Sequence, residues 1–187
     1  LWDAGVEMAV ETARMWSDLG FYDAKGAFHI HMVTGPDEYT ALVDDNTYTN
    51  LMARFNLGRA VDWSIRMKTE APDRYGDLVT RLGLDEQEIE DWRTAEAALH
   101  VPFDEARGIN PQDARFLERE PWDWETPRHL YPLLLHFHPL VIYRHQVLKQ
   151  PDVVMAVFNL PDDFTPEVAR ADFDFYDPIT TGDSSLS

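Results

Sequence analysis

Residues 29–39 read HIHMVTGPDEY and form the most informative segment of the chain. It continues a pattern that begins at Phe21: Lys25-Gly26 resembles a turn, and the apolar Phe28, Ile30 and Met32 alternate with Ala27, His29 and His31. This is the two-residue period of a short strand or hairpin over residues 21–32. Gly35 and Pro36 then interrupt this pattern, because Gly-Pro is a strong turn signal. Two carboxylic acids, Asp37 and Glu38, follow the turn at once. We therefore predict a short strand that leads into a rigid loop carrying two acids.

Helical patterns surround this segment on both sides. Residues 2–16 carry apolar side chains at alternating spacings of four and three, which is the period of an amphipathic helix. Asp85 with Glu88 forms an acidic capping pattern typical of a helix N-terminus. The remaining helices are expected to begin at Asn46, Pro151 and Thr165-Pro166.

Two proline-rich stretches separate the later helices. Residues 101–128 contain four prolines and no clean period, so we predict a long irregular loop, and loops of this kind are often functional. Residues 130–147 are apolar but are interrupted by Pro132 and Pro139, so two short helices are expected there. The sequence thus predicts a predominantly helical fold with one strand-like insertion.

The composition excludes several classes of partner. The chain has 187 residues, of which 44% are hydrophobic, enough for one domain with a sizeable core. Its net charge of −18 disfavours nucleic acid and anionic membranes as partners. No window approaches 18 uninterrupted apolar residues, so no membrane span is expected. The absence of cysteine excludes disulfides and thiolate metal sites and fits a cytoplasmic location.

The two acids allow two interpretations on spacing alone. Gly-Pro-Asp is an ordinary turn sequence, so the segment could be a solvated acidic turn. Alternatively, cleavage of a glycoside needs a carboxylic acid that protonates the leaving oxygen. A loop backed by Pro36 and Tyr39 could partly desolvate one of the acids and raise its pKa.

Three segments together resemble glycoside hydrolase family 65, which contains maltose, trehalose and kojibiose phosphorylases and some hydrolases. The first comprises residues 29–39 with residues 45–50, DNTYTN. The second, residues 144–154, reads RHQVLKQPDVV and resembles the family's Lys-Gln-Ala-Asp-Val-Val segment. The third, residues 176–187, reads YDPITTGDSSLS and resembles its Ser-Ser-Leu-Ser loop. The three occur in the family's order and span nearly the whole chain.

The resemblance implies an all-α fold that is part of an (α/α)6 barrel, with the strand-like insertion carrying the acid loop. Residues 1–187 are then expected to form part of a single (α/α)6-barrel catalytic domain, with both ends cut from a longer protein. The remainder of the same enzyme is therefore an expected partner, because a partial barrel leaves apolar helix faces exposed. A homodimer is expected by analogy with related enzymes.

The resemblance also assigns the acid and the sugar contacts. It implies that Glu38 is the general acid and that Lys149 and Gln150 hydrogen-bond the glucosyl unit that is transferred. We place Asp37, the neighbour of the acid, with the substrate-binding residues. Neither a metal nor a cofactor is expected, although inorganic phosphate is an expected co-substrate.

The nucleophile side of the site leaves more than one function open. Asp183, Ser184 and Ser185 are assigned to a phosphate or water site, because hydroxyls and loop amides suit an anion. Gly182 occupies the position where family members usually carry His, which argues against a complete phosphate site. The leading hypothesis is inverting phosphorolysis of an α-glucosidic disaccharide. The alternatives are inverting hydrolysis with Asp183 as base, and a non-catalytic carbohydrate-binding or scaffold fragment.

Several other polar and aromatic residues have simpler interpretations. Trp122 and Trp124 could stack on a sugar or anchor the long loop. Asp44 and Asp45 precede a helix and are expected to cap it or to favour its dipole, whereas Asn46 could line the cleft. Three histidines lack a carboxylate or cysteine at metal-ligand spacing, so structural roles are expected for His136, His138 and His145.

Overall fold

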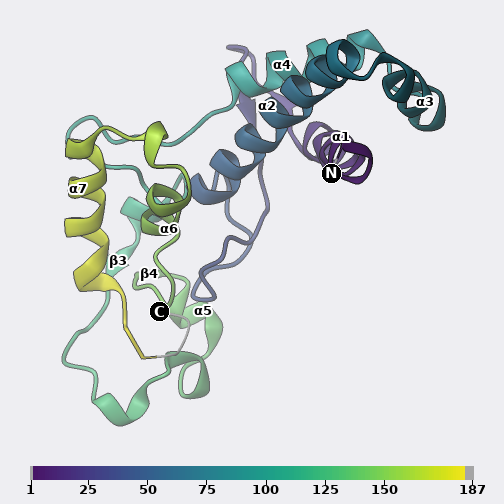
Figure 1. The fold of residues 1–187 in the computed structure, drawn as a ribbon. Coiled ribbons are helices and arrows are strands. Elements are labelled where there is room, and N and C mark those ends of the chain that lie inside the picture. The colour runs from purple at the N-terminus through teal and green to yellow at the C-terminus, as the bar shows by residue number, and fades with distance from the viewer. Residues whose placement is uncertain (1, 184–187) are drawn as a thin grey trace. The chain divides into compact units, whose positions relative to one another are not determined.

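The computed structural model describes residues 2–183, and helices dominate it (Figure 1). The chain forms two compact units, which are described separately. Unit 1 comprises Leu1–Ile30 and Asn50–His100, and unit 2 comprises His31–Thr49 and Val101–Ser187. No helix within residues 2–183 is long and apolar enough to cross a membrane. The single catalytic domain expected for residues 1–187 stays a prediction.

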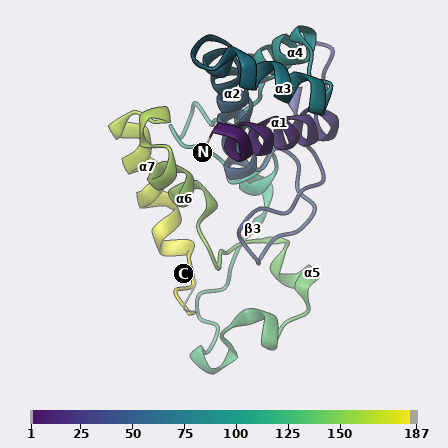
Figure 2. The ribbon, with the colours of Figure 1, turned by 45° about the vertical axis from the view of Figure 1, so that its right-hand side comes forward.

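Unit 1 contains four helices and one hairpin among its described residues, and α1 lies beside α3 (Figure 2). The hairpin pairs β1 with β2 in antiparallel register. The bounds are α1 Trp2–Leu19, β1 Phe21–Tyr22, β2 Phe28–His29, α2 Thr47–Glu70 (whose first turn belongs to unit 2), α3 Pro72–Leu82 and α4 Glu86–Ala98.

The first helix and the hairpin confirm the sequence analysis. The buried positions of α1 recur at helical spacing, and they are Val6, Ala9, Val10 and Ala13. In the hairpin the Asp23 carboxylate accepts hydrogen bonds from the backbone N–H groups of Lys25 and Ala27. Gly26 adopts a φ of 85° there, a left-handed conformation that glycine tolerates. These contacts close the turn and bring β2 back beside β1.

The ends of α3 and α4 follow local capping rules. The Asp85 carboxylate accepts a hydrogen bond of 2.8 Å from the Glu88 N–H, which confirms the predicted cap of α4. The sequence analysis did not predict α3, although its ends carry the ordinary signals. Pro72 lies in its first turn, and Gly83 ends it with a left-handed φ of 62°.

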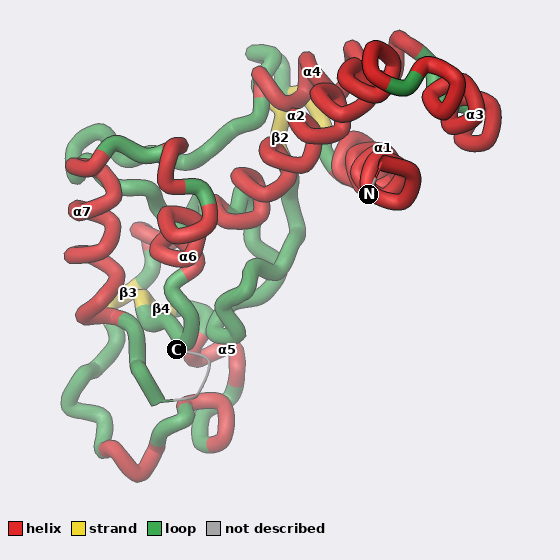
Figure 3. Tube along the Cα trace, viewed as in Figure 1, coloured by secondary structure: helices red, strands yellow, loops and turns green. Residues whose placement is uncertain are grey.

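Unit 2 is built largely from loops and short helices, and Figure 3 shows how much loop separates α4 from α6. Its strands β3 and β4 pair in parallel, and α6 packs beside α7. The bounds are η1 Phe116–Glu118, β3 Glu120–Pro121, η2 Arg128–Leu130, η3 Leu133–Leu135, α5 Pro139–Ile142, β4 His145–Gln146, α6 Asp152–Asn159, η4 Pro161–Asp163, α7 Pro166–Tyr176 and η5 Asp177–Ile179.

The prolines account for this irregularity. The loop expected over residues 101–128 is confirmed, apart from the 3-10 helix η1, the two residues of β3 and Arg128, the first residue of η2. The two short helices expected over residues 130–147 are the 3-10 helix η3 and the four-residue α5. Each begins next to a proline, Pro132 or Pro139, because proline fixes φ but donates no backbone hydrogen bond.

Two apolar clusters support unit 2. The first comprises Tyr39, Trp122, Leu133, Ile142 and Val147. The second comprises Phe116, Leu148, Val153 and Tyr176. Because residues 147–153 contribute to both clusters, this stretch is fixed by packing on either side of Lys149 and Gln150.

A bidentate ion pair joins α1 to α4 in unit 1. The Arg14 Nε and Nη2 atoms lie 2.5 and 2.8 Å from the two carboxylate oxygens of Glu88, and both side chains are about three-quarters buried. On the same helix Glu90 pairs with Arg93, but both of these side chains are largely exposed. Partial burial and fork geometry make the first pair the stronger one.

We expect Glu88→Gln to weaken the attachment of α4 to α1 by about 1 kcal/mol, since it removes one charge and half of the fork. Amide hydrogen exchange of α1 and α4 in the full-length protein measures this, with an expected acceleration of about fivefold. Glu90→Gln is the matched control and should leave exchange within about twofold. Equal effects of the two substitutions would contradict the assignment.

Candidate active site

The carboxylate of Glu38 lies at the centre of a polar cluster in unit 2. Its Oε2 atom accepts a hydrogen bond of 2.6 Å from Lys149 Nζ, and its Oε1 atom accepts one of 3.2 Å from Gln150 Nε2. The Gln150 Oε1 atom in turn accepts from the backbone N–H of Glu38 at 3.1 Å. Gln150 thus holds both the backbone and the side chain of Glu38. The structure brings together Glu38, Lys149 and Gln150, to which the family resemblance assigned the acid and the sugar contacts.

The two neighbouring acids have opposite environments. The Glu38 side chain is 46% exposed, and the hydrogen bonds from Lys149 and then Gln150 hold the pKa of its carboxyl below the ordinary value. Burial instead raises the pKa of the Asp37 carboxyl, although several hydrogen bonds oppose that rise. The expectation that the loop desolvates one acid is therefore met by Asp37, and it is wrong for Glu38.

The Asp37 side chain has no exposed surface. Its Oδ1 atom accepts hydrogen bonds from the backbone N–H groups of Tyr39, Lys149 and Gln150 at 3.1, 3.0 and 3.3 Å. Its Oδ2 atom accepts from Gln112 Nε2 at 2.9 Å. Every contact made by this carboxylate is internal to the protein, so the substrate contact expected of Asp37 stays a prediction.

The stretch leading to Asp183 runs beside the Lys149 segment. The Leu148 N–H donates to Ile179 O, and the Thr181 N–H donates to Leu148 O, both at 2.9 Å. The Tyr39 hydroxyl donates to Asp183 Oδ2 at 3.3 Å and accepts from the Leu133 N–H at 2.9 Å. Burial raises the pKa of Tyr39 to about 12, so this phenol stays neutral.

The predicted phosphate or water site is described only in part. Asp183 accepts hydrogen bonds from Tyr39 and from the Thr181 hydroxyl, the latter at 2.9 Å. Ser184 and Ser185 lie outside the described residues. The assignment of all three to that site stays a prediction.

A second buried carboxylate, Asp152, lies beneath the acid loop, and the sequence analysis gave it no role. Its Oδ2 atom accepts from Asn46 Nδ2 at 2.9 Å, and the backbone of Asp37 also donates to it. Burial raises the pKa of Asp152 to about 7, and the charge of Asp37 adds to the rise. The signal was present in the sequence, because Asp152 belongs to the segment of residues 144–154.

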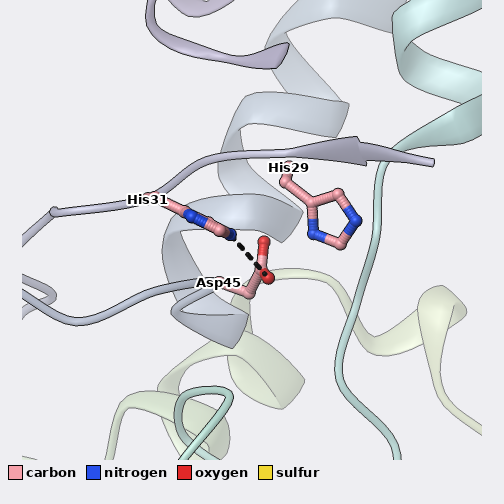
Figure 4. Close-up of side chains that lie close together, drawn as sticks. All are labelled: His29, His31 and Asp45. Carbon is pink, nitrogen blue, oxygen red and sulfur yellow. Dashed lines mark ion pairs between the residues drawn. The ribbon is translucent and has the colours of Figure 1, made fainter. Parts of the chain in front are cut away.

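The cap expected of Asp44 and Asp45 is wrong, because Asn46 caps α2 instead. A favourable effect of these two acids on the helix dipole stays a prediction. The Asn46 Oδ1 atom accepts from the Thr49 N–H at 2.9 Å, and Asn46 is fully buried rather than lining a cleft. Asp45 instead faces His31, whose Nε2 atom lies 3.4 Å from its carboxylate (Figure 4). Asp44 accepts a hydrogen bond from the backbone of Met32.

Two tryptophans of the long loop and two histidines of residues 130–147 make local contacts. Trp122 is buried and donates its indole N–H to the Tyr131 hydroxyl at 3.2 Å, so it anchors the loop, whereas Trp124 is 44% exposed. The His138 ring accepts from the Leu140 N–H, and the His145 ring contacts the Val141 carbonyl. These contacts support structural roles for both histidines.

A cleft of about 690 Å³ follows the acid loop in unit 2, but Glu38 does not line it. Its charged lining is mixed, because Arg119 is paired with Asp113 at 2.6 Å and Arg115 with Glu118 at 2.9 Å. Two of its three arginines are neutralised in this way, and the third, Arg144, shares the lining with the acidic Asp44 and Glu120.

Comparison with known proteins gives this cluster its context. The sequence profile described as "Glycosyl hydrolase family 65 central catalytic domain" matches residues 1–187. The chain belongs to glycosyl hydrolase family 65. The all-α fold expected for a family 65 chain is confirmed by a solved structure assigned provisionally to kojibiose phosphorylase, from the human microbiome. That structure has a TM-score of 0.85 and 29% identity, over 98% of this chain and 27% of that one.

Curated family 65 relatives include enzymes of named activity. The α,α-trehalose phosphorylase of Geobacillus stearothermophilus is 47% identical over 184 residues, and the kojibiose phosphorylase of Halothermothrix orenii is 32% identical over 189 residues. These alignments cover 98% and 100% of the chain. The chain spans about a quarter of the length of these relatives, 24% in both cases.

We expect Asp152→Asn to change the pH dependence of stability. With a folded pKa of about 7 against about 3.9 unfolded, Asp152 binds more protons in the folded state, so stability falls as the pH rises between these values. Asparagine does not titrate, so the free energy of unfolding of the variant lacks this pH-dependent loss. Relative to wild type, the free energy of unfolding of the variant should therefore rise by about 1 kcal/mol at pH 4.5 and by about 4 kcal/mol at pH 8.

Thermal unfolding of the full-length protein at several pH values measures this difference. Asp172→Asn is the matched control, because Asp172 is also fully buried in unit 2 and burial raises its pKa only to about 6. For this control, the difference in free energy of unfolding from wild type should stop growing at a pH about one unit lower than for Asp152→Asn. A difference between Asp152→Asn and wild type that does not vary with pH would contradict the raised pKa.

Proposed function

We propose that this chain is the part of a family 65 enzyme that cleaves an α-glucosidic disaccharide by phosphorolysis, with Glu38 as general acid. The observation that carries the proposal is the contact of the Glu38 carboxylate with Lys149 and Gln150. A carboxyl group, a cation and an amide that converge on one point suit protonation of a glycosidic oxygen beside a bound sugar. The phosphorylase activity of the named relatives supports the same reaction.

In the proposed reaction Glu38 donates its proton to the glycosidic oxygen as the bond between that oxygen and the anomeric carbon breaks. An oxygen of inorganic phosphate attacks the anomeric carbon from the opposite face and forms the new bond, so the configuration inverts. The products are glucose 1-phosphate and the released sugar, and Glu38 regains a proton from solvent. Phosphate needs no general base, so one catalytic carboxylate is sufficient.

The ion pair with Lys149 imposes a condition on this reaction. While Lys149 bonds to Glu38, the carboxyl is held in its ionised form and is a poor acid. A sugar hydroxyl that accepts the hydrogen bond of Lys149 instead would release the carboxyl and raise its pKa. Binding of the glucosyl unit and protonation of the acid are thereby coupled.

Trehalose is the first disaccharide to assay, because the trehalose phosphorylases are 47% and 48% identical to this chain, against 32% and 33% for a kojibiose and a maltose phosphorylase. The cytoplasmic location and the homodimer expected from the sequence remain predictions.

Glu38→Gln in the full-length protein should lower kcat for disaccharide cleavage by about 10²- to 10⁴-fold, because glutamine cannot donate the proton. Release of glucose 1-phosphate and free glucose from trehalose, maltose and kojibiose measures this, with and without inorganic phosphate. Glu118→Gln is the matched control, since Glu118 is an exposed acid of the same unit that pairs with Arg115.

Each alternative has its own outcome in this assay. Release of free glucose at a rate unaffected by phosphate would contradict phosphorolysis and favour hydrolysis, with Asp183 as the candidate base. Unchanged cleavage after Glu38→Gln would contradict the assignment of the acid. No cleavage of any disaccharide by the wild-type protein would favour a carbohydrate-binding or scaffold role.

Lys149→Met should move the alkaline limb of the pH profile of kcat/KM to higher pH. The substitution removes the cation that favours ionised Glu38, so the carboxyl keeps its proton at a higher pH. The value of kcat/KM should also fall roughly 10- to 100-fold, as expected for one lost charged hydrogen bond. Lys149→Arg retains the charge and should leave the limb in place. A limb that does not move in Lys149→Met would contradict the coupling.

A further inference from the structure

Asp37 joins three segments that are far apart in the sequence. Its Oδ1 atom binds the backbone of the acid loop at Tyr39 and the backbone of Lys149 and Gln150, which follow 112 and 113 residues later. Its Oδ2 atom binds the side chain of Gln112, which is 75 residues away. A buried carboxylate with four donors meets most of its hydrogen-bonding capacity and therefore has a defined position.

We propose that Asp37 is a positioning residue: its carboxylate holds the Glu38 loop and the Lys149–Gln150 segment in one register, and Asp152 with Asn46 supports the loop from beneath. This inference rests on the proposed function of Glu38. In this role Asp37 acts through the backbone of its partners, in place of the substrate contact expected from the sequence.

The register matters because the acid and its two partners extend from the residues that Asp37 anchors. Glu38 is the neighbour of Asp37 in the chain, while Lys149 and Gln150 donate their backbone N–H groups to it. A displacement of about 1 Å between a catalytic group and a bound substrate can cost about 100-fold in rate. One oxygen atom thus fixes the relative position of the acid and of the two side chains expected to hold the sugar.

The layer beneath the loop leaves no room for adjustment. Asn46 and Asp152 are both fully buried and are joined at 2.9 Å. A Cβ atom on Gly35 would lie 2.3 Å from Asp152 Oδ2 and 2.6 Å from Asn46 Nδ2, which is closer than atoms approach. The backbone of the acid loop therefore lies directly on this pair, and a larger residue at position 35 would force the two buried side chains to shift.

The test compares Asp37→Ala with Asp37→Asn in the full-length enzyme. Asparagine can accept the three backbone hydrogen bonds through its oxygen. It can also donate its amide to Gln112, whose buried Oε1 atom has no hydrogen-bond partner and is available after rotation of that amide. We expect kcat for the disaccharide to fall by about 100-fold in Asp37→Ala and by less than about 10-fold in Asp37→Asn.

A second substrate separates positioning of the acid from general damage. Fluoride leaves α-glucosyl fluoride with little help from a proton, so the loss in Asp37→Ala should be at least about tenfold smaller with this substrate than with the disaccharide. Gln112→Ala leaves the backbone contacts of Asp37 in place and should show the same bias with a smaller loss. If Asp37→Ala does not fold, the ratio of the two losses in Gln112→Ala tests the positioning role instead.

The control and the contrary outcomes are as follows. Asp172→Asn removes a buried charge of the same unit that binds the Asn110 backbone, and it should keep the wild-type ratio between the two substrates. Equal losses on both substrates, or a kcat within about threefold of wild type in Asp37→Ala and Gln112→Ala, would overturn the positioning role. If the positioning role of Asp37 fails in this way but Glu38→Gln abolishes cleavage, the proposed function of Glu38 still stands. If Glu38→Gln remains active, both the proposed function and the positioning role are contradicted.

Discussion

The buried carboxylate of Asp37 is the contact on which the geometry of unit 2 depends. Removing a charge from water is costly unless hydrogen bonds replace the lost hydration, and here three backbone N–H groups and one amide supply them. The Asp37 carboxylate becomes buried, and gains the hydrogen bonds that compensate for its burial, only when the acid loop, the Lys149 segment and Gln112 are assembled. Packing of Tyr39 and Leu148 in the two apolar clusters then fixes the same segments from their other sides.

This arrangement divides two tasks between adjacent residues. Asp37 faces the interior and determines where the loop lies, whereas Glu38 faces outward and is bound only by side chains that can exchange partners. Because Lys149 is tied to Asp37 through its backbone, its side chain is free to turn from Glu38 to a ligand without moving the loop. The Gln150 side chain, by contrast, also holds the backbone N–H of Glu38. A fixed backbone with a side chain that can change its hydrogen-bond partner allows the Glu38 carboxyl to change its protonation state while the loop stays in place.

Local patterns in the sequence were sufficient for many elements but not for the site. The spacing of apolar residues predicted α1, and Asp85 predicted the start of α4, because these signals act within one helical turn. The grouping of Glu38 with Lys149 and Gln150 came from the resemblance to family 65. Nothing local could have revealed that Asp37 is buried or that Gln112 and Asp152 lie beneath the loop, because these contacts join residues 75 to 113 positions apart. The Asn46 cap of α2 is different, because it joins residues only three positions apart.

The exposure of Glu38 has a practical consequence for crystallography. A side chain that fills no part of the apolar clusters can be exchanged for its amide, which has nearly the same size, without leaving a cavity. An inactivated enzyme of that kind keeps the surroundings of the uncleaved glycosidic bond intact. Crystals of it, soaked with the whole disaccharide, would hold the sugar in its ground state and make its acceptor half visible.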